Sequence, residues 1–382
     1  MLDPEIAYLN HGTVGAPPRR VIAEQRRIQD VIERQPAQFQ LRELADVDAS
    51  GEPAVPHMRV ATTAIAHHVG AAPADLVFVD NATTGVNAVL RSFPFDPGDE
   101  ILVMSLGYGG VNNIVTFLCD TAGTVMRQVT LPGPGGEPDQ YVSAIAGALT
   151  ARTRICLIDH ITSQTALVLP VADIARACHD AGVLVLVDGA HAPGAIDLDI
   201  ESLGVDWYVA NLHKWAFAPR SCGILWADPR VQSHLHPVTI SWGYGNGLGA
   251  EFDLLGTRDP SACLVAPFAF DLLNEWGGAD LMRHNHDTVW RAAHRLTERW
   301  GTSFTTPESM IGPMATIDLP AGLGATKEDA DNLRRALLAD SLIEVPVFGD
   351  GERLSLRLSA QIYNDDADFD RLADAIEARC SS

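Results

Sequence analysis

Lysine is nearly absent from this chain of 382 residues, which contains only Lys214 and Lys327 although lysine and arginine together number 27. Arginine therefore supplies nearly all of the positive charge. The formal net charge is −22, and no basic stretch interrupts it. A chain of this kind is repelled by phosphate backbones and by anionic membrane surfaces. We therefore expect neither nucleic acid nor a membrane as a partner.

Other absences narrow the class of protein further. The longest apolar runs, such as residues 183–187, are far too short to span a bilayer. The first residues are acidic and lack a cationic region followed by an apolar run, so we expect a cytoplasmic location. The six cysteines are scattered singly without a CxxC pair, which favours buried thiols over disulfides or a zinc site. Three histidine pairs, at 67/68, 234/236 and 284/286, lack supporting ligands, and we expect no metal.

The pattern of apolar segments predicts an α/β fold. From about residue 70 to 230, short apolar runs alternate with amphipathic segments, as expected for a mostly parallel sheet with helices on both faces. A nucleotide-binding oxidoreductase would share this pattern, but the chain shows neither G-x-G-x-x-G after its first strand nor a Walker loop. The predicted strands of the sheet cover residues 76–79, 101–104, 154–158 and 183–187.

A loop rich in glycine and aromatic residues at 241–249 precedes a smaller predicted α+β unit. Its predicted helices lie near 263–276, 279–299, 328–340 and 366–379, and its predicted strands near 314–319, 342–348 and 353–359. We therefore predict three parts: an N-terminal segment at 1–20 that contributes to the active site and the small domain, a large α/β domain at 21–255, and a small α+β domain at 256–382.

Lys214 follows an apolar strand directly and is flanked by His213 and Trp215. Desolvation at such a position lowers the pKa of a lysine, and a neutral amine can attack an aldehyde, as a Schiff-base lysine must. A purely structural lysine at a strand end explains this segment about equally well. Lys327 stands in a polar helix start, where a solvated surface charge is expected.

A second candidate site lies at the end of the buried strand at 183–187, which delivers Asp188 at its carboxyl end with His191 three residues later. Open α/β sheets bind ligands at this edge. A carboxylate there can keep a pyridinium nitrogen protonated, although an aspartate that caps a helix is the alternative. The turn at 81–87 brings together backbone N–H groups and the hydroxyls of Thr83 and Thr84. It suits either a bound phosphate or an ordinary helix cap.

The segments discussed above belong to a longer series of short motifs along the chain. The series covers residues 8–18, 81–87, 107–109, 188–191, 211–214, 256–261, 343–347 and 357–364. In that order they resemble the class V aminotransferase family of fold-type I pyridoxal-phosphate enzymes, in its isopenicillin N epimerase-like branch. The resemblance implies the fold-type I transferase fold, with pyridoxal 5'-phosphate bound in the large domain. It also implies an amino-acid substrate and a homodimer with shared active sites.

The resemblance further implies a role for each matching residue. Lys214 would hold the cofactor as a Schiff base and shuttle the α-proton, while Asp188 would pair with the pyridine nitrogen. The other implied roles are His191 beside the ring, Tyr108 stacked over it, Ser163 near the ring hydroxyl, Thr83, Thr84, Asn211 and His213 around the phosphate, Thr257 at the phosphate of the neighbouring subunit, and Arg357 and Asn10 at the substrate. Many relatives have serine where this chain has Asn211.

Without the resemblance, three of these residues have simpler interpretations. Arg357 alternates with Arg353 along a predicted strand and would be expected in a surface ion pair. Tyr108 could be a loop aromatic residue, and Asn10 could belong to a plain turn.

The reaction is left open by the sequence. Persulfide-forming desulfurases of this group use a cysteine shortly before the carboxylate-binding arginine, and residues 342–353 contain none. Epimerisation, transamination and β-elimination by a carbon–sulfur lyase remain. Epimerisation needs an acid on each face of the substrate, and Lys214 supplies only one. A non-catalytic binding protein on the same fold is a further alternative, which the presence of both Lys214 and Asp188 disfavours.

Overall fold

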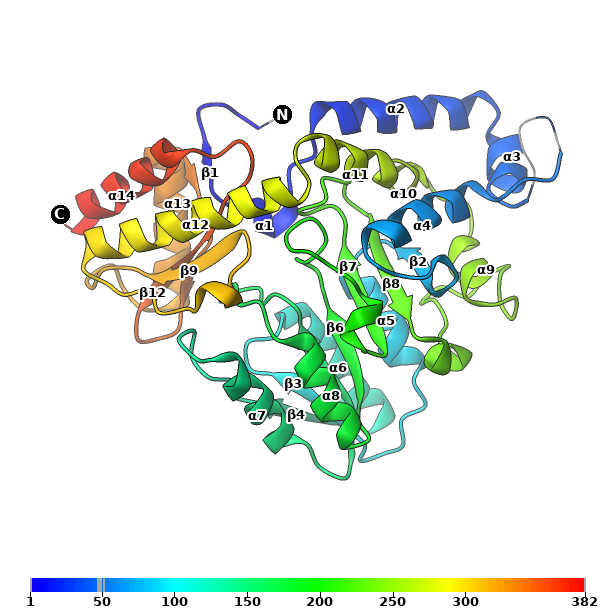
Figure 1. Ribbon diagram of the computed structural model, residues 1–382, viewed down its shortest axis with the longest axis horizontal. Coiled ribbons are helices and arrows are strands. Elements are labelled where there is room, and N and C mark those ends of the chain that lie inside the picture. The colour runs from blue at the N-terminus through cyan, green and yellow to red at the C-terminus, as the bar shows by residue number, and fades with distance from the viewer. Residues whose placement is uncertain (1, 47–49, 51, 381–382) are drawn as a thin grey trace.

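The computed structural model describes residues 2–46, 50 and 52–380 (Figure 1). The predicted N-terminal segment at 1–20 includes residue 1, and the predicted small domain at 256–382 includes residues 381 and 382. These three residues lie outside the described residues. Within the part of the chain that is described, no helix combines the length and apolar character that crossing a membrane requires.

A seven-stranded sheet with the order β2-β8-β7-β6-β5-β3-β4 forms the centre of the larger unit. Only β8 runs antiparallel to its neighbours, so the predicted mostly parallel sheet is confirmed. Its strands are β2 (Leu76–Val79), β3 (Glu100–Met104), β4 (Val125–Val129), β5 (Thr153–Asp159), β6 (Leu184–Asp188), β7 (Trp207–Asn211) and β8 (Gly223–Ala227).

Helices cover both faces of this sheet, as predicted. The helices of the larger unit are α2 (Arg19–Arg34), α3 (Pro36–Gln38), α4 (His57–His68), α5 (Ala82–Ser92), α6 (Gly109–Ala122), α7 (Pro138–Ala148), α8 (Val171–Asp180), α9 (Leu248–Asp253), α10 (Ser261–Leu264) and α11 (Ala266–Glu275). In β6, Val185 and Val187 pack toward α4, α7, α8, α10 and α11, whereas Leu186 packs toward α5, α6 and α9. This alternation explains why the strand is apolar at every position before Asp188.

A smaller unit has a core of its own around a three-stranded antiparallel sheet of order β11-β12-β9. Its elements are β9 (Met314–Asp318), β11 (Val347–Gly349), β12 (Leu354–Ser359), α12 (Ala279–Trp300), α13 (Lys327–Ser341) and α14 (Asp366–Cys380). The helices and strands predicted beyond residue 260 are thus confirmed, except that the first helix is divided into α10 and α11 and the second strand into β10 (Ile343–Glu344) and β11.

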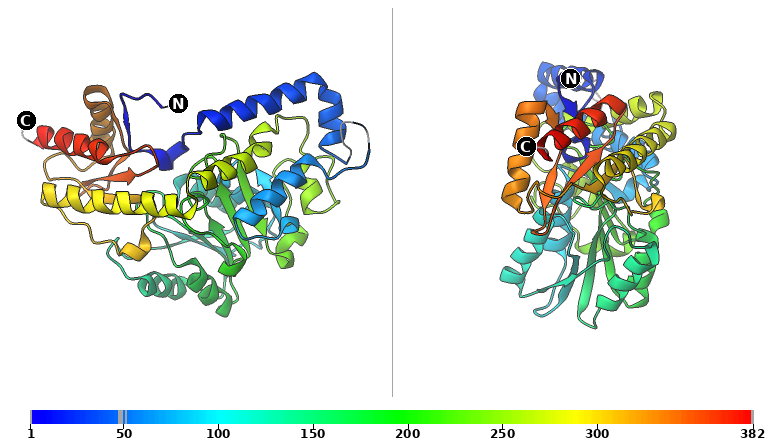
Figure 2. Two further views of the ribbon diagram at one scale, coloured as in Figure 1. Left: turned by 45° about the horizontal axis from the view of Figure 1, so that its top comes forward. Right: turned by 90° about the vertical axis from the view of Figure 1, so that its left-hand side faces the viewer.

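The N-terminal segment joins this smaller unit. β1 (Ala7–Tyr8) pairs in parallel with β10, and α1 (His11–Val14) follows directly. Figures 1 and 2 show α2 extending from this point along the outside of α10 and α11. Because α10 and α11 contribute to the core of the large sheet, we propose a domain boundary close to the start of α12, later than the predicted boundary at residue 256.

The parallel arrangement gathers polar strand ends at one edge of the large sheet. Asp159 at the end of β5 lies in register with Asp188 at the end of β6. Lys214 follows β7, and α5 begins after β2, whose carboxyl end is at the same edge. The segment from β1 to α1 meets this edge from the side of the smaller unit (Figure 1). The fold therefore brings residues from both ends of the chain to one place.

Close packing of α5 on the sheet offers a test of this arrangement. A Cβ atom added at Gly85 would lie 2.7 Å from Cγ1 of the buried Val209. We expect Gly85→Ala to lower the free energy of unfolding by roughly 1–3 kcal/mol because of overpacking, as measured by urea denaturation. Gly147→Ala in α7 is the matched control, since a Cβ there meets nothing within 4 Å. It should be neutral or stabilising, and equal losses in both variants would contradict the packing described.

Candidate active site

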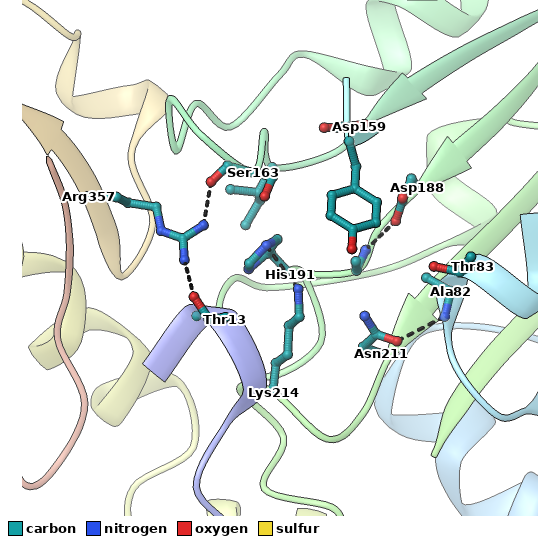
Figure 3. Close-up of a pocket in the computed structure, with 14 residues that line it drawn as sticks. Thr13, Ala82, Thr83, Asp159, Ser163, Asp188, His191, Asn211, Lys214 and Arg357 are labelled. Atoms are coloured by element: carbon teal, nitrogen blue, oxygen red, sulfur yellow. Dashed lines mark hydrogen bonds between the residues drawn. The ribbon is translucent and has the colours of Figure 1, made fainter. Parts of the chain in front are cut away.

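A cavity of about 200 Å³ opens at this edge of the sheet (Figure 3). The predicted site residues that line it are Thr83, Tyr108, Ser163, Asp188, His191, Asn211, Lys214 and Arg357. Residues that the sequence analysis did not single out complete the lining: Gly12, Thr13, Ala82, Asp159, Ile161 and Ala190.

Lys214 projects into the middle of the cavity, where its Nζ lies 3.0 Å from Nε2 of His191. The indole Nε1 of Trp215, which can only donate, lies 3.5 Å from the other ring nitrogen of His191. With Nδ1 accepting from the indole, a proton on Nε2 lets His191 donate to the lysine amine whenever that amine is neutral. Burial lowers the pKa of Lys214 to about 7, and the positive charge of Arg357 acts in the same direction. Burial likewise holds the pKa of His191 well below its usual value.

Two buried carboxylates stand side by side at the ends of β5 and β6. Burial raises the pKa of Asp188, and burial together with the nearby Asp188 raises the pKa of Asp159 well above its usual value. Asp188 accepts a hydrogen bond of 3.0 Å from the backbone N–H of Ala190. Neither carboxylate forms a salt bridge within the described ranges. Asp159 was missed from the sequence, although it obeys the same rule as Asp188: a polar residue directly after a buried strand.

The start of α5 forms another side of the cavity. Asn81 caps the helix by accepting from the N–H of Thr84 at 2.9 Å, and Asn211 accepts from the N–H of Ala82 at 2.9 Å. The N–H and hydroxyl of Thr83 have no partner among the described residues. Because they stand at the positive end of a helix, they suit an anion such as phosphate. The hydroxyl of Thr84 is bonded to Asn81 at 3.3 Å and does not line the cavity.

Arg357 reaches into the cavity from β12, on the side opposite Asp188 and Thr83 (Figure 3). Its guanidinium donates to the carbonyl of Ser163 and, at 2.9 Å, to the hydroxyl of Thr13. The residue is 3% exposed, its Nε has no partner, and no carboxylate pairs with it in the described part of the chain. The alternative of a surface ion pair is therefore wrong. A buried cation without an anion is costly, so this position fits a carboxylate ligand.

The remaining predicted residues lie outside the cavity. Asn10 donates to Oε1 of Glu344 at 2.8 Å, and Nδ1 of His213 lies 3.4 Å from the carbonyl of Cys222. Thr257 lines a separate groove beside Trp242. The family resemblance implies a role for Thr257 at the neighbouring subunit, and this role stays a prediction. No group of three possible metal ligands occurs among the residues that the structure describes.

Comparison with known proteins identifies the family. The family model described as aminotransferase class-V matches residues 42–336. The chain belongs to the class V aminotransferase family. It is 34% identical to a probable L-cysteine desulfhydrase of Arabidopsis thaliana, over 98% of this chain and 83% of that protein. It is also 31% identical to isopenicillin N epimerase of Streptomyces clavuligerus, over 99% of this chain and 96% of the epimerase.

Solved structures support the fold of this class V chain. The cystine C-S lyase C-DES, in complex with its product cysteine persulfide, superposes with a TM-score of 0.80 at 20% identity, covering 98% of this chain and 97% of that one. The predicted fold-type I transferase fold is thus confirmed, and so is the isopenicillin N epimerase-like resemblance. The protein is a pyridoxal-phosphate-dependent enzyme.

The groups that line the cavity fit this cofactor. The free N–H and hydroxyl of Thr83 suit its phosphate, the buried carboxylate of Asp188 suits its protonated ring nitrogen, and the neutral amine of Lys214 suits its aldehyde. Arg357 stays free for a substrate carboxylate. The phosphate, the ring nitrogen and the aldehyde of the cofactor thus each have a complementary group in the cavity.

The lowered pKa of Lys214 can be tested on cofactor-free protein with trinitrobenzenesulfonate, which modifies neutral amines. The neutral fraction grows as the pH rises through about 7, so we expect modification of Lys214 to reach its half-maximal rate near that pH. Mass spectra resolve each site because the chain has only two lysines, and Lys327 reports on the reagent itself. Modification of Lys214 only above about pH 10, near the ordinary lysine value, would contradict a desolvated amine.

Asp188→Asn should affect the cofactor-free and cofactor-loaded proteins in opposite directions. Because burial raises the pKa of Asp188, the folded chain holds its proton more tightly than the unfolded chain, and stability falls as the pH rises through the raised value. Asparagine does not titrate. We therefore expect Asp188→Asn to raise the thermal midpoint of the cofactor-free protein by about 1–3 °C at pH 8, and by less at pH 5.

In the loaded protein the same variant should lower the midpoint, because the carboxylate then pairs with a cationic ring nitrogen. Asp120→Asn, at an exposed position on α6, is the control for a lost surface charge. A loss of stability in both forms of Asp188→Asn would show that the carboxylate has a purely structural role.

Proposed function

We propose that this enzyme removes the α-proton of an amino acid and then breaks a carbon–sulfur bond at the β-carbon, as a β-eliminating lyase. The observation that carries the proposal is the arrangement of two groups across one cavity. They are the buried amine of Lys214, whose pKa burial lowers to about 7, and the buried guanidinium of Arg357, which pairs with no carboxylate among the described residues. An amino acid brings both of their partners, an acidic Cα–H and a carboxylate.

Each chain residue then has a defined task. Arg357 binds the α-carboxylate through the part of its guanidinium that lines the cavity and thereby orients the substrate. Lys214 takes the α-proton, and His191 positions its amine through the hydrogen bond of 3.0 Å. Pyridoxal phosphate, when bound, supplies the electron sink that stabilises the carbanion at the α-carbon. Asp188 keeps the ring nitrogen protonated. When the carbon–sulfur bond breaks, sulfur leaves with the bonding electrons, and the proton on Lys214 is available to it.

The choice of elimination rests on the number of acids and bases in the cavity. Elimination needs one base, whereas epimerisation needs a proton donor on each face of the substrate. Both ring nitrogens of His191 are engaged, and its pKa is far too low for it to carry a proton to the substrate. Cysteine desulfhydrases are also among the relatives at 33–34% identity. No cysteine lines the cavity, which agrees with release of a thiol and disfavours a persulfide on the enzyme.

Epimerisation is the second candidate. Tyr108 lines the same cavity, and its hydroxyl forms no hydrogen bond with another described residue, so it could serve as the second proton donor. Isopenicillin N epimerases at 31% identity also favour this reaction.

The proposal includes a cytoplasmic homodimer in which Thr257 reaches the phosphate of the neighbouring subunit. Trp242 supports this part, because its side chain is 89% exposed beside the groove that holds Thr257. A large aromatic residue with this exposure is typical of a surface that another chain covers.

The reaction is tested by incubating the loaded enzyme in heavy water with L-cysteine, S-alkylcysteines and a panel of L- and D-amino acids. We expect α-proton exchange together with equal amounts of thiol, pyruvate and ammonia. Lys214→Ala should reduce the rate by about 10²–10⁴-fold, the usual contribution of a positioned general base. Exchange with inverted configuration and no thiol would favour the epimerase. Keto acid without thiol would favour a transaminase, and no exchange with any compound would contradict the proposed reaction.

A further inference from the structure

A second groove, of about 550 Å³, continues outward from the active-site cavity. Four residues line both spaces: Thr13, Tyr108, Ser163 and Arg357. A substrate whose α-carboxylate is bound by Arg357 therefore has the groove directly beside it, with room for a side chain. The far part of the groove is formed by α13 and β11.

The wall of this groove changes from apolar to cationic along its length. Pro346, Val347 and Phe348 line it near Arg357, and α13 adds Lys327 and Arg334. These two residues are seven apart, which places them two turns apart on one face of the helix. Asp331 lies between them and is 3.8 Å from Arg334, so the groove keeps a net positive charge. The side chain of Lys327 has no hydrogen bond or ion pair to any described residue.

The position of Lys327 is fixed by the fold. α13 begins at this residue behind a capping box in which Thr326 and Asp329 satisfy each other's backbone N–H groups. β11 approaches the same point so closely that a Cβ on Gly349 would collide with the carbonyls of Ala325 and Thr326. Glycine at this position therefore lets the start of α13 lie directly against the groove. Although its side chain is exposed, the backbone that carries Lys327 is held in place.

The charge of the whole chain makes this local arrangement informative. With a formal charge of −22, the protein repels anions at a distance, so an anionic substrate needs a local cationic patch at the entrance. The chain has only two lysines; Lys214 lines the cavity, and Lys327 lines the groove that continues from it.

We propose that the substrate is an amino acid whose side chain ends in a carboxylate, which Lys327 and Arg334 bind at the outer end of the groove. The inference rests on the proposed function and narrows its substrate class. For a carbon–sulfur lyase, the leaving thiol then carries the second carboxylate. The apolar stretch at Pro346 and Phe348 contacts the methylene groups between the two ends of the substrate.

The test compares matched pairs of substrates that differ only in the charge at the far end. S-Carboxyalkyl-L-cysteines with one to three methylene groups are paired with the corresponding carbamoylalkyl compounds, which have nearly the same size but no charge. Exchange of the α-proton in heavy water is the readout, because it precedes elimination, epimerisation and transamination alike. For at least one length, we expect the acid to have a KM roughly three- to tenfold below that of the amide, as two exposed ion pairs would produce.

The variant Lys327→Gln/Arg334→Gln should remove this preference by raising KM for the acid, with kcat and the KM for the amide unchanged. Arg335→Gln is the control, because it removes one of the positive charges of α13, where the double variant removes two, at a position that bonds to Asn332 and does not line the groove. The preference in the wild-type enzyme should also weaken between low and high salt, since both cations are exposed.

Two failures can be told apart. If wild-type enzyme exchanges the α-protons of acid and amide equally at every length, or if Arg335→Gln abolishes the preference as fully as the double variant, the groove does not recognise a carboxylate, while the proposed function stands. If no compound exchanges its α-proton, the proposed function is wrong, and the inference about its substrate is overturned with it.

Discussion

The constraint on which the site depends is buried charge that the chain does not neutralise by itself. Arg357 carries a guanidinium without an anion at one side of the cavity. At the other side, burial raises the pKa of Asp188, and burial together with Asp188 raises the pKa of Asp159 well above its usual value, so the two neighbouring acids do not both carry a charge. Unpaired buried charges cost several kcal/mol each, so the rest of the fold must keep them in place. A substrate carboxylate and a cationic cofactor ring are the partners that would relieve the cost, and they would enter from opposite sides of Lys214.

Both ends of the chain are needed to maintain this separation. The large sheet supplies Asp188 and Lys214 from the ends of parallel strands, where side chains gather without any special turn. Arg357 comes from the smaller sheet, and its hydroxyl partner Thr13 comes from the N-terminal segment. The pairing of β1 with β10 holds these two together. The substrate side of the site therefore depends on contacts between residues more than 300 positions apart, whereas the cofactor side is assembled within one domain.

This difference explains what the sequence could predict. Asp188 and Lys214 stand after apolar strands, a local signal that can be recognised in a short window. Thr13 carries no such signal, because its role arises only when β1 meets β10. Lys327 was expected to be a surface charge at a helix start, and α13 does begin there. Its relation to the cavity depends on the close approach of Gly349, a contact that no local pattern announces. The family resemblance predicted that Arg357 lies at the substrate. The alternation of residues in its own strand had instead predicted a surface ion pair.

The two cationic residues of the cavity show why lysine and arginine are not interchangeable there. Burial lowers the pKa of both, to about 7 for Lys214 and to about 10 for Arg357. The same desolvation therefore gives the two residues different charge states at neutral pH, because the ordinary pKa of arginine is higher than that of lysine. At neutral pH, Arg357 remains a cation that can bind a carboxylate, while a large fraction of Lys214 is an uncharged base. Exchanging the two would put a permanent charge where a base is needed and a titrating amine where an anion is bound. A chain that relies on arginine for nearly all of its positive charge therefore requires lysine at this position.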